Sequence, residues 1–477
     1  MESADDDRFS FNGVDASSGR PLLPDLPAAA LARLARGLPV DAEAVELHEL
    51  RASQPFVTAE DVDPRRLEEA GWGVVFPHDI DPAIREALAP LLAHRQAQAS
   101  AVSDRRYREF LGPDAHRPGE RKQAFLARHG VARSGPVDPD RLPYYLLIVG
   151  DPARVPFEFQ AQLDVQYAVG RLHFDRVEDY AHYARSVVHA ETTHISRSGL
   201  TLFGTRHPGD RASELSSEHL IGGLHAAIAR TRARCPLALV PAAEANKARL
   251  ARLLGGPDTP ALLFTAGHGV GFPADDPRQR DHQGALLCQD WPGPAWSRPI
   301  PQDFYFAGDD LPHDADLRGL VAFFFACFGG GTPQRDGFHP RGQGPPPLLA
   351  AEPFVARLAS QLLAHPRGGA LAVVAHVDRS WASAFHGGRS GPEVEVFTSA
   401  IKRMIDGHPV GYVMEYFGSR HAELSADLAL ALGEDSEPGL ARDRELADLW
   451  TTSSDARNYL VLGDPAVRVS TNDAARA

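Results

Sequence analysis

The chain has 477 residues, of which 43% are hydrophobic and 23% are charged, as in globular proteins of two or three domains. Its formal net charge is -14, no basic block stands out and no apolar run is long enough to span a membrane, so we expect neither nucleic acid nor a membrane as a partner. The three cysteines form no CxxC pair and the acidic start has no apolar signal core, which together favour a cytoplasmic location.

The first part of the chain is predicted to contain little sheet. Residues 1–20 are acidic and polar and are predicted to be disordered, so their deletion should have little effect. Residues 21–140 are predicted to form a mostly helical N-terminal region. Its clearest helix begins with Asp81 as the N-cap and Pro82 at the first helical position.

From Tyr144 onward, short apolar runs alternate with stretches of helical spacing. We expect a first α/β subdomain over residues 141–198 and a larger α/β domain over residues 199–470. Near-continuous apolar strands between amphipathic helices predict a mainly parallel sheet with helices on both faces. The main predicted strands are YYLLIVGD, LTLFGTR, CPLALVP, PALLFTAGHG, GLVAFFFACFGGG, GALAVVAHVDRSW and NYLVLGDPAVRV. The first and last share a Gly-Asp-Pro-Ala ending, which indicates either related subdomains or a recurring strand-to-loop turn.

Two of these strands end in similar motifs. LLFTAGHGVG carries His268 between two glycines, and FFFACFGGG carries Cys327 shortly before three glycines. Ligands of such sheets bind beyond the carboxyl ends of the strands, so both side chains face one crevice if the strands are neighbours. A cysteine nucleophile needs an imidazole to take its proton, and glycines let backbone N–H groups reach an oxyanion. The two motifs therefore predict a His-Cys dyad.

Other interpretations of these residues are weaker. Cys235 and Cys288 lie in apolar segments and are interpreted as small buried hydrophobes. A zinc site made of His268, His282 and Cys288 matches no common ligand spacing. The glycine run FGGGTP lacks the Lys-Ser/Thr of a phosphate-binding loop. We therefore expect no metal and no cofactor.

The motifs FTAGHG and FFFACFGGG resemble the His-Gly and Ala-Cys motifs of the caspase-like cysteine peptidases, the clan of caspases, gingipains and CHAT/separase-type proteases. The likeness is nearest to gingipain-like bacterial members and covers about Tyr144 to Val469. It implies a caspase-like sandwich, with residues 199–470 as the catalytic domain. It also implies a cysteine endopeptidase of the EC 3.4.22 type that acts on a protein substrate. Phe325 stands where caspases have Gln.

The resemblance also implies roles for individual residues. Cys327 is expected to be the nucleophile and His268 the general base and acid. The backbone N–H groups of Gly269 and Cys327 are expected to be the oxyanion donors. Relatives of this clan act in bacterial stress and antiviral-defence pathways. The resemblance therefore also implies an activating protease or a regulatory partner as a candidate partner. The alternative is a catalytically silent caspase-like module that binds partners.

The strand after the cysteine strand lines the specificity pocket in the caspase-like fold. Here it ends in Asp378 and Arg379, and only one of two adjacent strand residues can face the pocket. An inward Asp378 predicts cleavage after Arg, and less well after Lys, with Trp381 as an apolar wall for the substrate side chain. An inward Arg379 predicts cleavage after Asp. The remaining alternative is an ion pair between the two residues that caps the strand.

Two inserts border the predicted crevice and are rich in Pro, Gly and charged residues. If the enzyme cleaves after basic residues, they offer candidate sites for processing. The alternative is an active-site lid whose arginines keep it hydrated. The candidate processing sites are Arg278, Arg280, Arg335 and Arg341.

Overall fold

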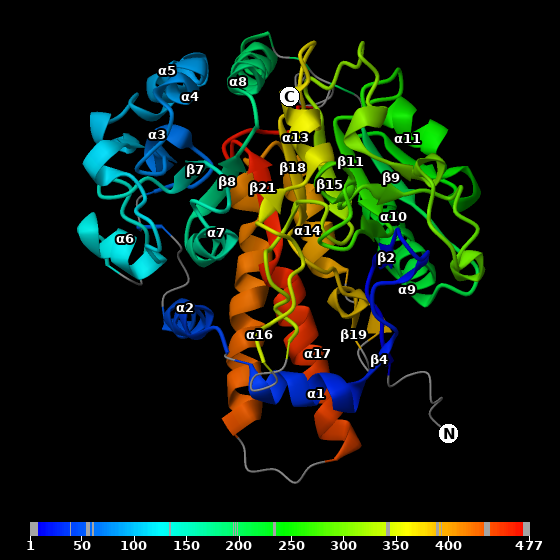
Figure 1. Cartoon of the computed structure of the whole chain (residues 1–477). Coiled ribbons are helices and arrows are strands. Elements are labelled where there is room, and N and C mark those ends of the chain that lie inside the picture. Colours follow the sequence, from blue (N-terminus) through cyan, green and yellow to red (C-terminus); the bar gives the residue numbers. More distant parts are fainter. Residues whose placement is uncertain are drawn as a thin grey trace.

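A computed structural model of the 477-residue chain describes residues 8–38, 40–53, 58–59, 62–132, 135–193, 195, 197, 199–231, 235–339, 344–387, 391–392, 394–433 and 439–470. It confirms the α/β class, because the fold is organised around one ten-stranded, mostly parallel sheet (Figure 1). The strands in spatial order are β10 (Leu237–Val240), β9 (Leu200–Gly204), β11 (Leu262–Ala266), β15 (Val321–Phe325), β18 (Ala372–His376), β21 (Tyr459–Gly463), β8 (Ala168–Leu172), β7 (Tyr145–Val149), β5 (Trp72–Val75) and β6 (Tyr107–Phe110).

The sheet consists of two parallel halves of five strands each. All neighbouring pairs are parallel except β18 and β21, which pair antiparallel where the halves meet. Every residue of the seven central strands from β9 to β7 is buried, so both faces of the sheet are covered. The carboxyl ends of β9, β11, β15 and β18 therefore lie at one edge of the sheet.

The helices pack around this sheet and against one another. α13 contacts β18, β21 and α8, whereas α14 contacts α10 and α16. The helices are α1 (Ala28–Gly37), α2 (Ala42–Ser53), α3 (Leu67–Ala70), α4 (Pro82–Ala87), α5 (Ala89–Ala99), α6 (Lys122–Arg128), α7 (Phe157–Asp164), α8 (Val177–Thr192), α9 (Arg211–Leu215), α10 (Gly222–Arg230), α11 (Lys247–Leu253), α12 (Gln279–His282), α13 (Arg357–Ala364), α14 (Glu395–Ile405), α15 (Val410–Val413), α16 (Glu415–Gly433) and α17 (Leu440–Arg457).

The N-terminal segment is more ordered than its composition predicted. Residues 1–7 lie outside the described residues, but the prediction of disorder is wrong for residues 8–20. Here β2 (Gly13–Asp15) pairs in parallel with β12 (Gly269–Gly271) in a second, five-stranded sheet. Figure 1 shows this segment in blue beside elements from much later in the chain. Residues 10–14 of the stretch FSFNGV are buried there, an effect that the average composition of twenty residues conceals.

The second sheet has the order β14 (Tyr305–Phe306), β13 (Leu286–Leu287), β12, β2 and β3 (Arg20–Pro21). Three two-stranded ribbons complete the strands: β1 (Arg8–Phe9) with β4 (Leu26–Pro27), β16 (Gly331–Thr332) with β17 (Phe354–Val355), and β19 (His386–Gly387) with β20 (Gly391–Pro392).

The region predicted to be mostly helical also supplies two strands of the main sheet. β5 and β6 both come from residues 21–140, so this region extends the sheet instead of forming a separate helical part. Its helices are present as expected, and the Asp81 side chain caps α4 by accepting a hydrogen bond from the Ala83 N–H. α1 crosses α17 at the far end of the molecule, where Figure 1 shows them in contact.

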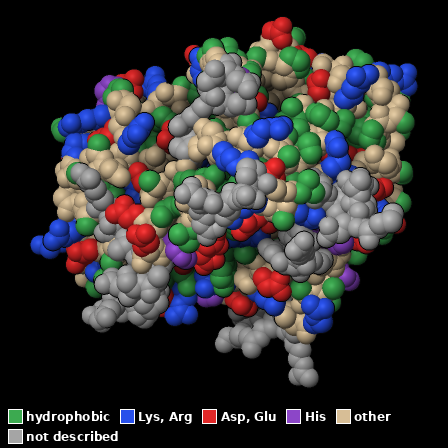
Figure 2. All heavy atoms as spheres, turned by 90° about the horizontal axis from the view of Figure 1, so that it is seen from below, with side chains coloured by type: hydrophobic (Ala, Val, Ile, Leu, Met, Phe, Trp, Pro, Cys, Tyr) green, Lys and Arg blue, Asp and Glu red, His purple; other side chains and the backbone are tan. Residues whose placement is uncertain are grey.

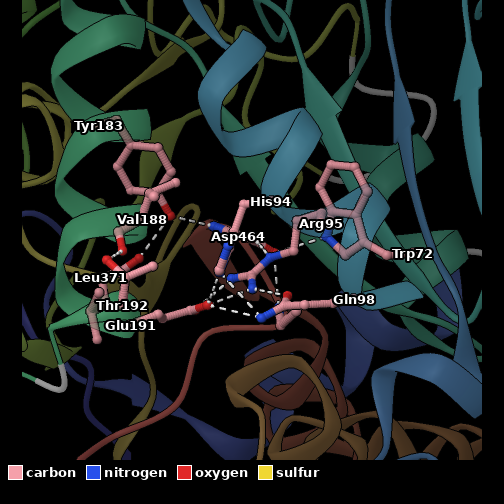
Figure 3. Close-up of polar contacts among 11 residues, drawn as sticks. Trp72, His94, Arg95, Gln98, Tyr183, Val188, Glu191, Thr192, Leu371 and Asp464 are labelled. Atoms are coloured by element: carbon pink, nitrogen blue, oxygen red, sulfur yellow. Dashed lines mark hydrogen bonds and ion pairs between the residues drawn. The ribbon is translucent and has the colours of Figure 1, made fainter. Parts of the chain in front are cut away.

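A buried ion cluster joins elements from both ends of the chain (Figure 3). The carboxylate of Asp464, just after β21, accepts hydrogen bonds from Arg95 Nε at 2.6 Å and Trp72 Nε1 at 3.0 Å. Arg95 also pairs with Glu191 at 2.6 Å. Burial alone would raise the pKa of Glu191, but the Arg95 charge and the His94 hydrogen bond hold that pKa at about 2. The cluster ties β21 to α5 and α8.

The repeated Gly-Asp-Pro-Ala ending is a recurring turn at two strand ends. Oδ1 of Asp151 accepts from the Ala153 N–H, and Oδ1 of Asp464 accepts from the Ala466 N–H. The strands concerned, β7 and β21, flank β8 on either side. The repeat therefore has a local cause, because an aspartate closes the same turn in both places.

The face of the molecule drawn in Figure 2 shows no large basic patch among the described residues, in agreement with the absence of a basic block in the sequence. On the face drawn in Figure 2, basic and acidic side chains of the described residues are interspersed. Among the described residues, no helix combines the length and the apolar character needed to cross a bilayer.

Candidate active site

The ends of β11 and β15 lie side by side, so the two motifs meet. These strands are parallel neighbours, with Ala266 opposite Phe325. Just beyond them, a Cβ on Gly269 would lie 1.9 Å from the carbonyl oxygen of Cys327. Real Cβ atoms essentially never come within 3.0 Å of another heavy atom, so this approach requires glycine. The flanking glycine thus lets the histidine and cysteine loops touch.

His268 is paired with a carboxylate that the sequence analysis missed. Its Nε2 lies 2.6 Å from Oδ2 of Asp210, and both side chains are buried. Burial favours the neutral acid, but the charge and hydrogen bond of His268 outweigh it and hold the pKa of Asp210 at about 2. Nδ1 of His268 is buried and has no hydrogen-bond partner in the described part of the chain. A proton on Nε2, facing Asp210, leaves Nδ1 as the proton acceptor.

Cys327 is fully buried and its sulfur accepts hydrogen bonds. The Ser380 backbone N–H donates to Sγ at 3.3 Å, and the Ser380 hydroxyl oxygen lies 3.7 Å away. Burial raises the pKa of the Cys327 thiol to about 12, although the Ser380 hydrogen bonds act in the opposite direction. Donors beside the sulfur favour the thiolate, whereas burial, the larger effect, favours the neutral thiol.

Two backbone N–H groups near the sulfur converge on one oxygen. The Cys327 N–H donates to the carbonyl oxygen of Asn12 at 3.1 Å, and the Gly269 N–H donates to the same oxygen at 3.4 Å. These are the two groups predicted to be the oxyanion donors. The position can therefore hold a carbonyl oxygen beside a thiol, as an acyl-transfer site requires.

Asp378 and Arg379 lie beyond the end of β18. Asp378 has a φ of 83°, so the alternation of side chains along an extended strand does not apply to this pair. The two side chains form an ion pair at 3.2 Å, and Arg379 also bonds both carboxylate oxygens of Asp336 at 2.8 and 3.0 Å. An ion pair between Asp378 and Arg379 is one of the alternatives given by the sequence, next to a role of either residue in the specificity pocket.

The Asp378 carboxyl lines a cavity of about 400 Å³ together with Phe338 and Trp450. The residues around this cavity include neither His268 nor Cys327. Burial raises the pKa of Asp378 to about 6, against the attraction of Arg379.

Trp381 is buried between two phenylalanine rings and does not line an open wall. Its ring centroid lies 5.4 Å from that of Phe11 and 5.3 Å from that of Phe338. It therefore contacts a side chain of the N-terminal segment, at the position where a substrate side chain was expected.

Three of the four candidate processing sites can be located. Arg278 pairs with Asp276 at 2.7 Å, and Arg280 stacks over Phe354 at 5.1 Å from the ring centroid. Arg335 donates to the Pro346 carbonyl at 3.0 Å, whereas Arg341 lies outside the described residues. Arg280 and Arg335 are exposed.

The residues of the zinc alternative have other surroundings. His282 Nδ1 lies 2.7 Å from the Tyr305 hydroxyl, and burial raises the pKa of the Cys288 thiol. Cys235 is buried, as expected. Within the described ranges, no group of three or more His, Cys, Asp or Glu side chains is arranged to hold a metal ion.

Three residues at the site were missed by sequence reasoning: Asp210, Ser380 and Asn12. Asp210 follows β9, and the rule that sites gather at strand ends would have pointed to it had the β9–β11 adjacency been known. Ser380 directly follows Asp378 and Arg379, and its own sequence context carries no catalytic motif. Asn12 belongs to the segment interpreted as disordered, and nothing local to it signals its partner 255 residues away.

Comparisons with known proteins add one distant likeness. No protein-family model and no curated protein sequence matches the chain. One solved structure, named "Structure of Protease", is similar with a TM-score of 0.47 and 12% identity over 88% of this chain and 82% of that chain. A likeness this weak carries no argument about activity.

Proposed function

We propose that this protein is a cysteine endopeptidase with Cys327 as nucleophile and His268 as general base and acid. The observation that carries the proposal is the convergence of the Cys327 and Gly269 N–H groups on one carbonyl oxygen beside the thiol. Such a pair of donors stabilises the charge that develops on a peptide oxygen under attack. The buried Asp210–His268 pair supports the same chemistry.

In the proposed reaction each of these groups has one role. Nδ1 of His268 takes the thiol proton, while Asp210 holds the ring through Nε2–H and favours the charged imidazolium. The sulfur attacks the peptide carbonyl carbon, and the oxygen receives the Gly269 and Cys327 N–H groups. The imidazolium then gives its proton to the departing amine, which leaves a thioester on Cys327. Water hydrolyses this thioester and restores the thiol.

Specificity for Arg through Asp378 stays a prediction, and one observation speaks against it. Asp378 pairs with Arg379 and lines a cavity that does not include the nucleophile. Arg379, which would select Asp, is already bound by Asp336 and Asp378. The residue whose backbone carbonyl oxygen lies at the oxyanion position is Asn12, and its side chain is an uncharged amide that bonds the Gly267 carbonyl. The geometry therefore favours a small uncharged residue before the scissile bond.

The test is hydrolysis of a fluorogenic peptide library that varies the residue before the scissile bond. Cys327→Ala and His268→Ala should each abolish turnover, and the double variant should be no worse than either single one, because the two groups act as a unit. Substantial turnover by a folded Cys327→Ala or His268→Ala protein contradicts the assignment.

Asp210 is expected to be a positioning residue. Asp210→Asn should lower kcat by at least about tenfold with little change in KM, since an amide cannot support the imidazolium. Asp210→Glu, which keeps a carboxylate beside the ring, should retain more of kcat than Asp210→Asn. An equal loss of kcat in the two variants would leave Asp210 with a purely structural role.

A further inference from the structure

The N-terminal segment lies along the site as an added strand. Residues 10–12 run antiparallel to residues 380–382: the Asn12 N–H donates to the Ser380 carbonyl at 3.0 Å, and the Ala382 N–H donates to the Ser10 carbonyl at 3.0 Å. Extended peptides bind many receptors by pairing in this way with an exposed strand edge. The segment thus uses backbone groups that any bound peptide could use.

The Asn12–Gly13 bond lies at the catalytic residues. The Asn12 carbonyl oxygen receives the Cys327 and Gly269 N–H groups, and a Cβ on Gly13 would lie 3.0 Å from the Cys327 sulfur. The Gly13 N–H donates to the Phe11 carbonyl at 3.2 Å, so the backbone turns tightly at Asn12. Glycine after the turn leaves room for the sulfur beside this peptide bond.

The side chains of the segment also have specific contacts. Asn12 is completely buried, and its Nδ2 donates to the Gly267 carbonyl at 3.1 Å, directly before His268. Phe11 packs against Trp381. A small amide and a preceding aromatic ring therefore fill two positions that a peptide would occupy.

We propose that the Asn12–Gly13 bond is a self-cleavage site, and that the enzyme acts on peptides with Asn before the scissile bond. This rests on the proposed peptidase function. The Cys327 sulfur bonds to the Asn12 carbonyl carbon, the C–N bond to Gly13 breaks, and the Gly13 nitrogen takes the proton from His268. Water then hydrolyses the Asn12 thioester. The products are a chain that begins at Gly13 and a peptide that ends at Asn12.

The segment also covers the site until it is cut. Cys327 is 0% exposed and His268 is 1% exposed, so another peptide cannot reach them while residues 10–13 are bound. Cleavage frees the short peptide that ends at Asn12, and β2 stays paired with β12 through Gly13 onward. Self-cleavage therefore comes before activity on other substrates.

The first test follows the full-length chain by intact mass and N-terminal sequencing during incubation. The wild-type chain should convert to one that begins at Gly13, at a rate independent of protein concentration. Cys327→Ser should stop this conversion. Asn-Gly bonds also rearrange spontaneously, and any change at the Asn12–Gly13 bond that remains in Cys327→Ser measures that background. Asn12→Ala should slow it at least about tenfold, because the Gly267 carbonyl loses its donor. Asn246→Ala, which removes an asparagine that caps α11, is the matched control and should cleave like wild type.

The second test separates this inference from the proposed function. Phe11→Asp should displace the segment without touching the catalytic residues, and its folding is checked by circular dichroism. This variant should hydrolyse acetyl-Ser-Phe-Asn-aminomethylcoumarin at least about tenfold faster than the same peptide with Arg in place of Asn. Iodoacetamide should label its Cys327 far faster than Cys235.

The outcomes distinguish the two proposals. If Phe11→Asp hydrolyses peptides while the wild-type chain keeps its Asn12–Gly13 bond, self-cleavage is wrong and the peptidase stands. Cleavage of Asn12→Ala at the wild-type rate, or a preference for Arg, overturns the Asn specificity. If folded Phe11→Asp cleaves no peptide in the library and its Cys327 reacts no faster than Cys235, the peptidase proposal itself fails.

Discussion

At the scale of single residues, the site combines buried charges with strained backbone. Phe328 and Asp378 both have positive φ, 60° and 83°, and the Phe328 N–H donates to the Asp378 carbonyl at 2.8 Å. Non-glycine residues adopt this region rarely and at a cost, so it persists where surrounding contacts determine it. Here the strain shapes the turns that follow the nucleophile and β18.

Asp378 should make the protein less stable as the pH rises. Its folded pKa of about 6 lies above that of the unfolded chain, near 4, so the folded state binds the extra proton. The free energy of unfolding should therefore fall between pH 4 and pH 6, by roughly 3 kcal/mol from this group. Asp378→Asn cannot titrate and should show a smaller fall. Urea unfolding at pH 4, 5, 6 and 7 measures the difference, and parallel curves for the two proteins would refute it.

At the scale of elements, the N-terminal strand β2 is part of a core. Val14 is completely buried in a cluster with Val270, Leu287 and Tyr305 from the second sheet. The strand begins at Gly13, so its docking also positions Asn12, the residue directly before it. The earlier expectation that residues 1–20 can be removed at little cost is therefore replaced by its opposite for residues 8–20.

Val14→Ala should lower the free energy of unfolding by about 2 kcal/mol, because it removes buried methyl groups and leaves a small cavity. The control is Val102→Ala, whose side chain is 66% exposed and should cost little. Chemical denaturation of the two variants gives the comparison. Equal stabilities for both would show that β2 is not docked in solution.

At the scale of the whole molecule, a buried ion cluster secures the second half of the sheet. Arg95 bonds Asp464 after β21 and Glu191 on α8, and its side chain is only 2% exposed. β21 pairs with β18 of the other half of the sheet. A shift of β21 would therefore also displace β18, and with it Ser380, which lies shortly after the end of β18.

Arg95→Met should destabilise the fold by about 3–5 kcal/mol, since it leaves the carboxylate of Asp464 buried without its countercharge. The matched control is Arg66→Met, which breaks the ion pairs of an exposed arginine with Glu68 and Glu69 and should cost less than about 1 kcal/mol. Thermal and urea unfolding both measure the effect. A loss for Arg95→Met no larger than for Arg66→Met would contradict this account of the cluster.

The sequence by itself determined the α/β class, seven of the ten strands of the main sheet and the two motifs with His268 and Cys327, because apolar periodicity and glycine placement are local properties of the chain. It could not determine which strands are neighbours. The positions of Asp210 beside His268, of Ser380 beside Cys327 and of Asn12 in the oxyanion position all depend on the order β9-β11-β15-β18 and on the docking of β2. The direction in which the Asp378 side chain points could not be derived from strand alternation for a related reason: its backbone has a positive φ and leaves the strand geometry.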